Sequence, residues 1–166
     1  YAQIPYLKEL ILALGWDFLE ADEYEADDII GTLARQADEK HDYMTYIVSS
    51  DLDMLQIVDE NTKMYRLLKG FSELEELDVA AVEAKYGILK EQFLELKALK
   101  GDNSDNIPGV PGIGEKGAVK LLNEYKTLDG IYEHINEIKG ATQKKLIAGR
   151  ESAYMLFLEG RLNCID

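Results

Sequence analysis

Residues 25–53 read EADDIIGTLARQADEKHDYMTYIVSSDLD, and this stretch decides the fold class. Its first part repeats apolar residues at the spacing of one helical face, which predicts an amphipathic helix over 25–37. Its second part, YMTYIVS at 43–49, is rich in aromatic and β-branched residues and predicts a buried strand. A helix followed directly by a buried strand is typical of a layered α/β fold.

The rest of the chain changes character at residue 101. Before it, expected strands alternate with expected helices; after it, the loop GDNSDNIPGVPGIGEKG is followed by helices alone. We therefore expect residues 1–100 to form part of an α/β core and residues 101–166 to form a helical region continuous with it. The other expected helices are 5–14, 78–86, 90–100, 115–125, 128–138 and 142–159, and the other expected strands are 16–19 and 61–68.

Composition excludes several classes of protein. The 166 residues are 46% hydrophobic and 30% charged, as in an ordinary globular domain. No run approaches the about 18 apolar residues of a membrane span, so we expect no membrane partner. The sole cysteine, Cys164, excludes an internal disulfide, and two histidines argue against a zinc site built from several histidines. We find no targeting signal before the first expected helix.

The net charge of −14 is unevenly distributed. Residues 1–101 hold 22 acidic and 10 basic residues, whereas residues 102–150 hold 7 of each. A net negative charge argues against nucleic acid as a partner, but most of this excess is concentrated in the first part of the chain. Either that part is a solvated acidic surface, or its carboxylates have a cationic partner.

Acidic residues gather in three short clusters, and each has an ordinary structural explanation. The first lies at the start of the helix over 25–37, where the helix dipole favours acids. The second directly follows the strand over 43–49, and the third lies in the loop after residue 100, where Asp caps turns. The clusters consist of Glu25, Asp27 and Asp28, of Asp51 and Asp53, and of Asp102 and Asp105.

Together the three clusters favour a metal site. Crowded carboxylates repel one another unless a cation lies between them, and oxygen ligands without Cys or His select hard ions such as Mg²⁺ or Mn²⁺. Two such ions about 3.5–4 Å apart can activate a water and stabilise a leaving oxygen in phosphodiester cleavage. Convergence of the clusters in space is an expectation that the sequence by itself does not prove.

The segment 112–117 fits the dinucleotide pattern G-x-G-x-x-G. That pattern requires a preceding strand, and here NIPGVP at 106–111 precedes it, so a nicotinamide or flavin site is disfavoured. We interpret the segment as a hairpin between helices whose backbone amides approach a phosphate, with Lys116 and Lys120 adding positive charge. The alternative is a loop whose glycines serve only the turn.

Three motifs resemble the bacterial 5′-nuclease family, which includes the 5′–3′ exonuclease domain of DNA polymerase I and is related to flap endonucleases. They are EADDIIGTLA at 25–34, SSDLDMLQIV at 49–58 and GDNSDNIPGVPGIGEKGAVKLL at 101–122. Their order and spacing match that family over essentially the whole chain, and Ser50 stands where many relatives have Gly. The resemblance implies a sheet of the PIN-like kind followed by a helix–hairpin–helix-type DNA-binding motif.

The resemblance also implies roles for individual residues. The seven carboxylates of the three clusters match the family's metal-site positions and would hold two Mg²⁺ or Mn²⁺ ions for hydrolysis of DNA phosphodiesters near a 5′ end or flap. The hairpin would grip the duplex backbone and hold K⁺. Its matching positions are Gly109, Gly112, Ile113, Gly114, Lys116 and Lys120. The parent protein would act in replication and repair, carry a polymerase domain and lie in the cytoplasm, associated with the nucleoid.

The resemblance predicts that the chain begins inside the family's nuclease domain. Relatives carry a further N-terminal segment with the first sheet strand, two more metal-binding aspartates and a basic helical arch. We therefore expect the chain alone to cleave DNA poorly or not at all. A non-catalytic, structure-specific DNA-binding module that uses only the hairpin is the alternative function, and a cofactor-binding α/β protein is a third interpretation.

Overall fold

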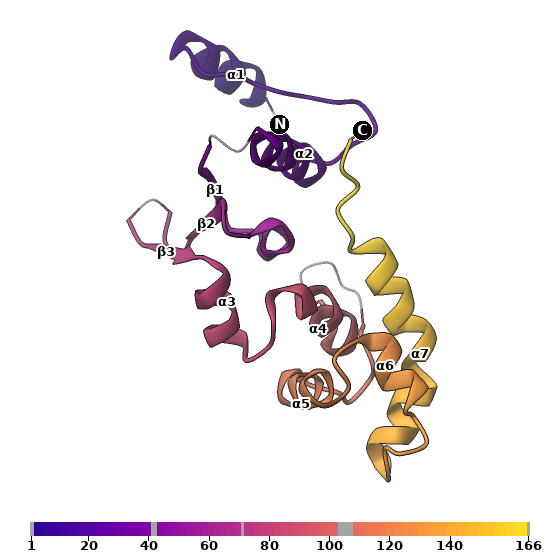
Figure 1. Ribbon diagram of the computed structural model, residues 1–166. Helices are drawn as coiled ribbons and strands as arrows, with labels where there is room; N and C mark the ends of the chain where they lie inside the picture. Colours follow the sequence, from indigo (N-terminus) through magenta and orange to yellow (C-terminus); the bar gives the residue numbers. More distant parts are fainter. Residues whose placement is uncertain (1, 41–42, 71, 103–107, 166) are drawn as a thin grey trace.

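The computed structural model describes residues 2–40, 43–70, 72–102 and 108–165. Its centre is a three-stranded mixed sheet with strand order β1-β2-β3 (Figure 1). Strand β1 (Thr45–Ser49) pairs parallel with β2 (Thr62–Leu67), and β2 pairs antiparallel with β3 (Leu74–Leu77). The short helix η1 (Leu52–Ile57) lies on the connection between the two parallel strands. The first acidic turn after β1 is thereby placed at the carboxyl end of the parallel pair.

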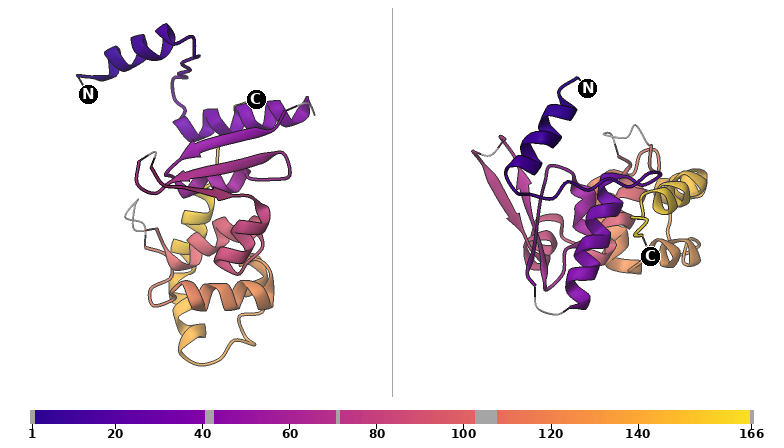
Figure 2. Two further views of the ribbon diagram at one scale, coloured as in Figure 1. Left: turned by 90° about the vertical axis from the view of Figure 1, so that its left-hand side faces the viewer. Right: turned by 90° about the horizontal axis from the view of Figure 1, so that it is seen from above.

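The helices before and after the sheet begin and end where local chemistry predicts. Helix α2 (Ala26–Glu39) starts after Glu25 and packs against β1 and η1. Helix α3 (Val79–Tyr86) starts at Asp78, whose side chain accepts the N–H of Ala81, and ends at Gly87 with φ of 69°. Helix α1 (Ile4–Ala13) has no buried residue, and Figure 2 shows it standing apart from the sheet.

The second part of the chain is helical. A short helix η2 (Lys90–Gln92) runs into α4 (Phe93–Lys100), in which every residue from Phe93 to Leu99 is buried. Helices α5 (Glu115–Tyr125) and α7 (Ala141–Glu159) pack against α4, and α6 (Leu128–Glu133) packs against α5. Helix α4 therefore lies at the centre of the helical part, between the sheet and α7 (Figure 1).

Two apolar clusters form the core. The sheet cluster comprises Ile47, Met54, Leu55, Val58, Met64, Leu77, Val82 and Phe93. The helical cluster comprises Ile88, Leu96, Ala98, Leu99, Val110, Ile113, Ala118, Leu121, Leu122, Leu128, Ile131, Tyr132, Ile138, Leu146, Ala153 and Leu156. Helix α4 contributes to both, because Phe93 faces the sheet while Leu96 and Leu99 face the other helices. It joins the two clusters into one packed body.

Most of the expected elements are confirmed. The helices expected over 5–14, 25–37, 78–86, 115–125 and 142–159 and the strand over 61–68 are present within a residue or two of the expected bounds. No helix in the described ranges has the length and apolar character needed to traverse a bilayer.

Several expectations about the elements are wrong. Residues 16–19 form no strand, because an apolar tetrapeptide needs a partner strand and has none among the described residues. The helix expected over 90–100 is divided into η2 and α4, and the one over 128–138 ends at Glu133. Strand β1 is only partly buried: Ile47 faces the core, but Tyr46 and Val48 are about half exposed on the outer face of the sheet. Strand β3 and helix η1 were not predicted.

Candidate functional site

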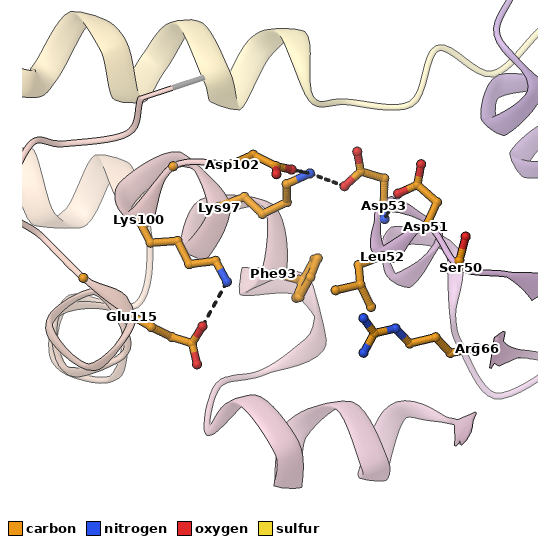
Figure 3. Close-up of a pocket in the computed structure, with 12 residues that line it drawn as sticks. Ser50, Asp51, Leu52, Asp53, Arg66, Phe93, Lys97, Lys100, Asp102 and Glu115 are labelled. Carbon is orange, nitrogen blue, oxygen red and sulfur yellow. Dashed lines mark hydrogen bonds and ion pairs between the residues drawn. The ribbon is translucent and has the colours of Figure 1, made fainter. Parts of the chain in front are cut away.

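Two cavities meet at a row of four charged side chains. The row, called here the charged row, consists of Asp51, Asp53, Lys97 and Asp102, which line both cavities. The larger cavity measures about 660 Å³ and the other, the acidic cavity, about 400 Å³. Figure 3 shows the charged row with Lys97 between two of the aspartates. The row is therefore the shared wall of the whole site.

The acidic cavity brings the three acidic clusters together. Its walls come from the start of α2, the turn after β1, the end of α4 and the segment that follows α7. Asp105 lies outside the described residues. The predicted site residues that line the acidic cavity are Glu25, Asp27, Asp28, Asp51, Asp53 and Asp102.

The turn after β1 is held by its own side chains. The Ser49 hydroxyl oxygen accepts the N–H of Asp51 at 3.0 Å, and Asp51 Oδ1 accepts the N–H of Asp53 at 2.9 Å. Asp51 thereby caps η1, which turns the chain away from the sheet. Both aspartates are thus placed at the carboxyl end of β1, where α/β sheets position ligands.

Asp28 is occupied by backbone amides. One of its carboxylate oxygens accepts the N–H of Glu25 at 3.2 Å, and the other accepts the N–H of Asn163 at 2.6 Å. The first contact closes the start of α2, and the second attaches the segment after α7 to that helix. Asp28 is buried, and in this structure its carboxylate connects two distant parts of the chain.

Sequence reasoning missed Lys97. Its ammonium donates to Asp53 Oδ1 and lies 2.5 Å from Asp102 Oδ2, although the residue is only 7% exposed. Burial lowers the pKa of Lys97, but the hydrogen bonds and charges of Asp102 and Asp53 more than compensate, so that its pKa is raised. No spacing pattern marks Lys97, because every residue of α4 from Phe93 to Leu99 is buried and the helix has no polar face on which a cation would be expected.

The pKa of Asp53 is also raised. Burial is the largest cause, and the negative charges of Asp51 and Asp102 act in the same direction, whereas the hydrogen bond and charge of Lys97 oppose them. The charged row thus sets three aspartates against one lysine, and two of those aspartates disfavour ionisation of the third.

The carboxylates suit a hard cation in their chemistry but are not assembled into a ready site. Within the described ranges, no group of three or more His, Cys, Asp or Glu side chains lies close enough together to hold a metal ion. The acidic side chains that line the acidic cavity offer carboxylate oxygens, the kind of ligand that Mg²⁺ and Mn²⁺ prefer. Lys97 is the cation that lies between Asp53 and Asp102 here.

The glycine loop before α5 divides into a packed part and an open part. A Cβ on Gly109 would lie 2.2 Å from the backbone nitrogen of Gly101, so this glycine permits a close backbone approach. Ile113 is 7% exposed and packs in the helical cluster, which leaves only its backbone available to a ligand. Gly112 has φ of 83°, and its carbonyl accepts a hydrogen bond from Lys145.

The open part of the loop faces the larger cavity. Gly114 caps α5, lines that cavity and would meet nothing within 4 Å if it carried a Cβ. Lys116 and Lys120 are exposed one turn apart on α5. The start of α5 therefore presents amides and two lysines to solvent beside the charged row.

Two family models match nearly the whole chain. Residues 1–87 match the 5′–3′ exonuclease N-terminal resolvase-like domain, and residues 88–162 match the 5′–3′ exonuclease C-terminal SAM fold. The chain belongs to the 5′–3′ exonuclease family. The predicted division at residue 100 stays a prediction, since α4 packs with both apolar clusters.

Curated relatives place the chain with the nuclease region of DNA polymerase I. It is 43% identical over 155 residues to DNA polymerase I of Lactococcus lactis, covering 92% of the chain and 18% of that protein. It is 42% identical over 163 residues to DNA polymerase I of Bacillus caldotenax, covering 98% of the chain and 18% of that protein. The chain thus spans less than a fifth of the length of these relatives.

Solved structures share the fold. A T5 D15 protein structure superposes with a TM-score of 0.79 at 22% identity, covering 96% of the chain and 58% of that protein. The catalytic core of Rad2 superposes with a TM-score of 0.68 at 19% identity, covering 99% of the chain and 55% of that protein. These likenesses support an α/β fold with a three-stranded mixed sheet and a helical C-terminal region.

Proposed function

We propose that the chain supplies the carboxylate site and part of the DNA-binding surface of a metal-dependent 5′–3′ exonuclease or flap endonuclease. The observation that carries the proposal is the convergence of acidic residues from three separate segments on one cavity beside the glycine loop. Family membership supports it, and so do the titles of solved neighbours: T5 5′-exonuclease with zinc, T5 flap endonuclease with DNA and metal ions, and Rad2 with DNA substrate. The substrate would be a DNA phosphodiester near a 5′ end or flap, cleaved during replication and repair.

The metal would be Mg²⁺ or Mn²⁺, held by carboxylates of the acidic cavity. Asp51, Asp53 and Asp102 would bind it directly together with Asp105, and Glu25, Asp27 and Asp28 would complete the site directly or through water. When bound, two such ions supply an activated water and stabilise the leaving oxygen. The carboxylates of the chain would set the positions of the bound ions. Before metal binds, Lys97 keeps Asp53 and Asp102 beside each other.

The glycine loop would hold duplex DNA by its backbone. Gly109, Gly112, Ile113 and Gly114 shape a hairpin of the helix–hairpin–helix type, with K⁺ as a further ligand, and Lys116 and Lys120 would contact phosphates. Contacts of this kind carry no base pattern, so binding would be independent of sequence and would weaken as salt rises. The PIN-like sheet, the polymerase domain of the parent protein and its place at the nucleoid belong to the same proposal.

A second candidate function is a DNA-binding module without catalysis. It is favoured by the position of Lys97 between Asp53 and Asp102, because a cation is already present where a metal ion would bind. Flap cleavage with Mg²⁺ by a full-length version of the protein separates the two candidates: the nuclease requires turnover that depends on the carboxylates, and the module requires DNA binding without turnover.

Calorimetric titration with Mn²⁺ tests the metal site directly. We expect weak binding to the wild-type chain and its loss in the double variant Asp51→Asn, Asp102→Asn. The matched control is Asp17→Asn, Asp22→Asn, which removes the same charge from exposed positions that do not line the acidic cavity. Equal Mn²⁺ binding by both double variants would show that the acidic cavity is not the metal site.

A further inference from the structure

Arg66 has an unsatisfied donor beside the charged row. Its Nε is buried and has no hydrogen-bond partner among the described residues. Buried polar atoms are almost always paired, so an unpaired donor in a cavity wall requires an explanation. Its charge partner is Glu75, whose Oε2 lies 3.8 Å from the guanidinium, beyond hydrogen-bond distance.

The position of Arg66 in the sheet directs it to the site. It lies near the end of β2, opposite Ser49 of β1, and side chains alternate along a strand. Lys63 and Tyr65 bond Glu76 on the outer face, whereas Arg66 shares the inner face with the buried Met64. It is therefore a cation at the carboxyl end of a parallel strand pair, the edge where α/β sheets bind ligands.

Arg66 and Lys100 approach the larger cavity from opposite sides. Figure 3 shows both side chains pointing toward Phe93, Arg66 from β2 and Lys100 from the end of α4. Lys100 is paired with Glu115 at 2.9 Å, so Arg66 has the greater unused capacity for hydrogen bonds. The cavity volume of about 660 Å³ is ample for a nucleotide-sized group.

We propose that Arg66 binds a backbone phosphate of the DNA strand in the larger cavity, next to the phosphodiester held at the charged row. This inference rests on the proposed function and deepens it. A guanidinium matches a phosphate with two parallel hydrogen bonds, and a shift of the side chain into the cavity would bring its buried Nε within reach of a phosphate oxygen. Arg66 and the charged row line the same cavity, so a strand lying in that cavity would contact both.

The competing explanation is structural. Arg66 would then serve only to pair with Glu75 and to steady the β2–β3 hairpin. The two explanations give different results for Glu75→Gln. If Arg66 is structural, this change reproduces Arg66→Gln; if Arg66 binds phosphate, releasing it from Glu75 leaves DNA binding unchanged or strengthens it.

The experiment is fluorescence anisotropy with a labelled single-stranded oligonucleotide in Ca²⁺ at several salt concentrations. We expect Arg66→Gln to weaken binding about tenfold and to reduce the slope of log affinity against log salt by about 0.7, the value for one lost phosphate contact on a single strand. Arg66→Lys should retain the wild-type salt slope but only part of the wild-type affinity. It keeps the positive charge but loses the paired N–H groups of the guanidinium. Inorganic phosphate added as competitor should displace the oligonucleotide only weakly if the site binds a phosphate as part of a DNA strand.

The matched control is Lys63→Gln, which removes one positive charge from the outer face of the same strand. Three results would each overturn the inference. They are an affinity and salt slope in Arg66→Gln equal to those of wild type, a loss of affinity in Lys63→Gln as large as that in Arg66→Gln, and no oligonucleotide binding by the wild-type chain. The Mn²⁺ titration is independent of this outcome. If Arg66→Gln leaves DNA affinity unchanged while Mn²⁺ still binds, only the inference about Arg66 is refuted. If Mn²⁺ binding is unchanged in the Asp51→Asn, Asp102→Asn variant, the proposed metal site is refuted.

Discussion

The sheet cluster and the helical cluster differ in how many apolar side chains they bury and in how close they lie to charged groups. Among the described residues, the helical cluster contains 16 buried residues, from Ile88 to Leu156, whereas the sheet cluster contains 8. Apolar side chains such as Leu33, Tyr46 and Val48 remain about half exposed around the sheet, and the charged row borders it. The helical side is therefore held by close packing, and the sheet side depends more on which charges are paired.

The largest effect should come from the closest backbone packing on the helical side. We expect Gly109→Ala to destabilise the fold severely, because the new Cβ would meet backbone atoms of Gly101 and Leu99 at 2.2 and 2.7 Å. Gly114→Ala is the matched control in the same loop, since its Cβ would enter open space at a φ of −92°. Thermal unfolding followed by circular dichroism measures both, and similar melting temperatures for the two variants would contradict the packing argument.

On the sheet side, removing a cation should act strongly. We expect Lys97→Met to destabilise the metal-free chain by about 3–5 kcal/mol, because it leaves Asp53 and Asp102 as partly buried carboxylates without their cation. Denaturant unfolding measures the loss. Lys100→Met is the control, since its more exposed pair with Glu115 should contribute at most about 1 kcal/mol.

Mn²⁺ sharpens the same comparison. Added metal should raise the melting temperature of Lys97→Met more than that of the wild-type chain, because the ion then no longer competes with the Lys97 ammonium for Asp53 and Asp102. An identical metal response in both proteins would show that Lys97 and the metal do not share a position.

Two core substitutions test whether the clusters unfold together. Leu122→Ala in the helical cluster and Met64→Ala in the sheet cluster each truncate a fully buried side chain, and each should cost about 2–5 kcal/mol. Because α4 belongs to both clusters, we expect one unfolding transition that moves in both variants. Separate transitions, each sensitive to only one substitution, would show that the halves are independent.

The smallest effect should be a pH dependence on the helical side. Burial raises the pKa of Glu95, and the N–H of Leu128 only partly offsets this. The folded chain therefore holds the proton more tightly than the unfolded chain, so stability falls as pH rises from the unfolded pKa through the raised folded pKa. Glu95→Gln keeps an acceptor for Leu128 and should flatten that fall, as measured by melting temperature across the acidic range; a fall as steep as that of wild type would place the titration elsewhere.

Local patterns predicted those parts of the fold that local physics controls. The apolar repeat over 25–37 became α2, and the signals at Asp78 and Gly87 became the ends of α3. Strand β3 was missed because LEEL carries two glutamates and is held mainly by pairing with β2. The 16–19 segment failed for the complementary reason, since apolar residues make a strand only where another strand is available.

The candidate site divides in the same way. The acidic clusters and the glycine loop were visible as residue types at a given spacing, and the convergence of Glu25, Asp51 and Asp102 on one cavity was expected but could not be demonstrated. Lys97 and Arg66 were not singled out, because a single cation inside a helix or strand has no spacing signature. Their importance comes from carboxylates and cavities contributed by other segments.

By itself, the sequence determined the α/β character, the carboxylate and glycine motifs and the family, because each depends on residues near one another in the chain. Only the tertiary structure decided that Lys97 lies between Asp53 and Asp102, that both oxygens of Asp28 accept backbone amides, and that the buried Nε of Arg66 has no hydrogen-bond partner among the described residues. The physical reason is that a charge buried on folding takes its partners from distant segments. Those partners are chosen by packing, which no local pattern records.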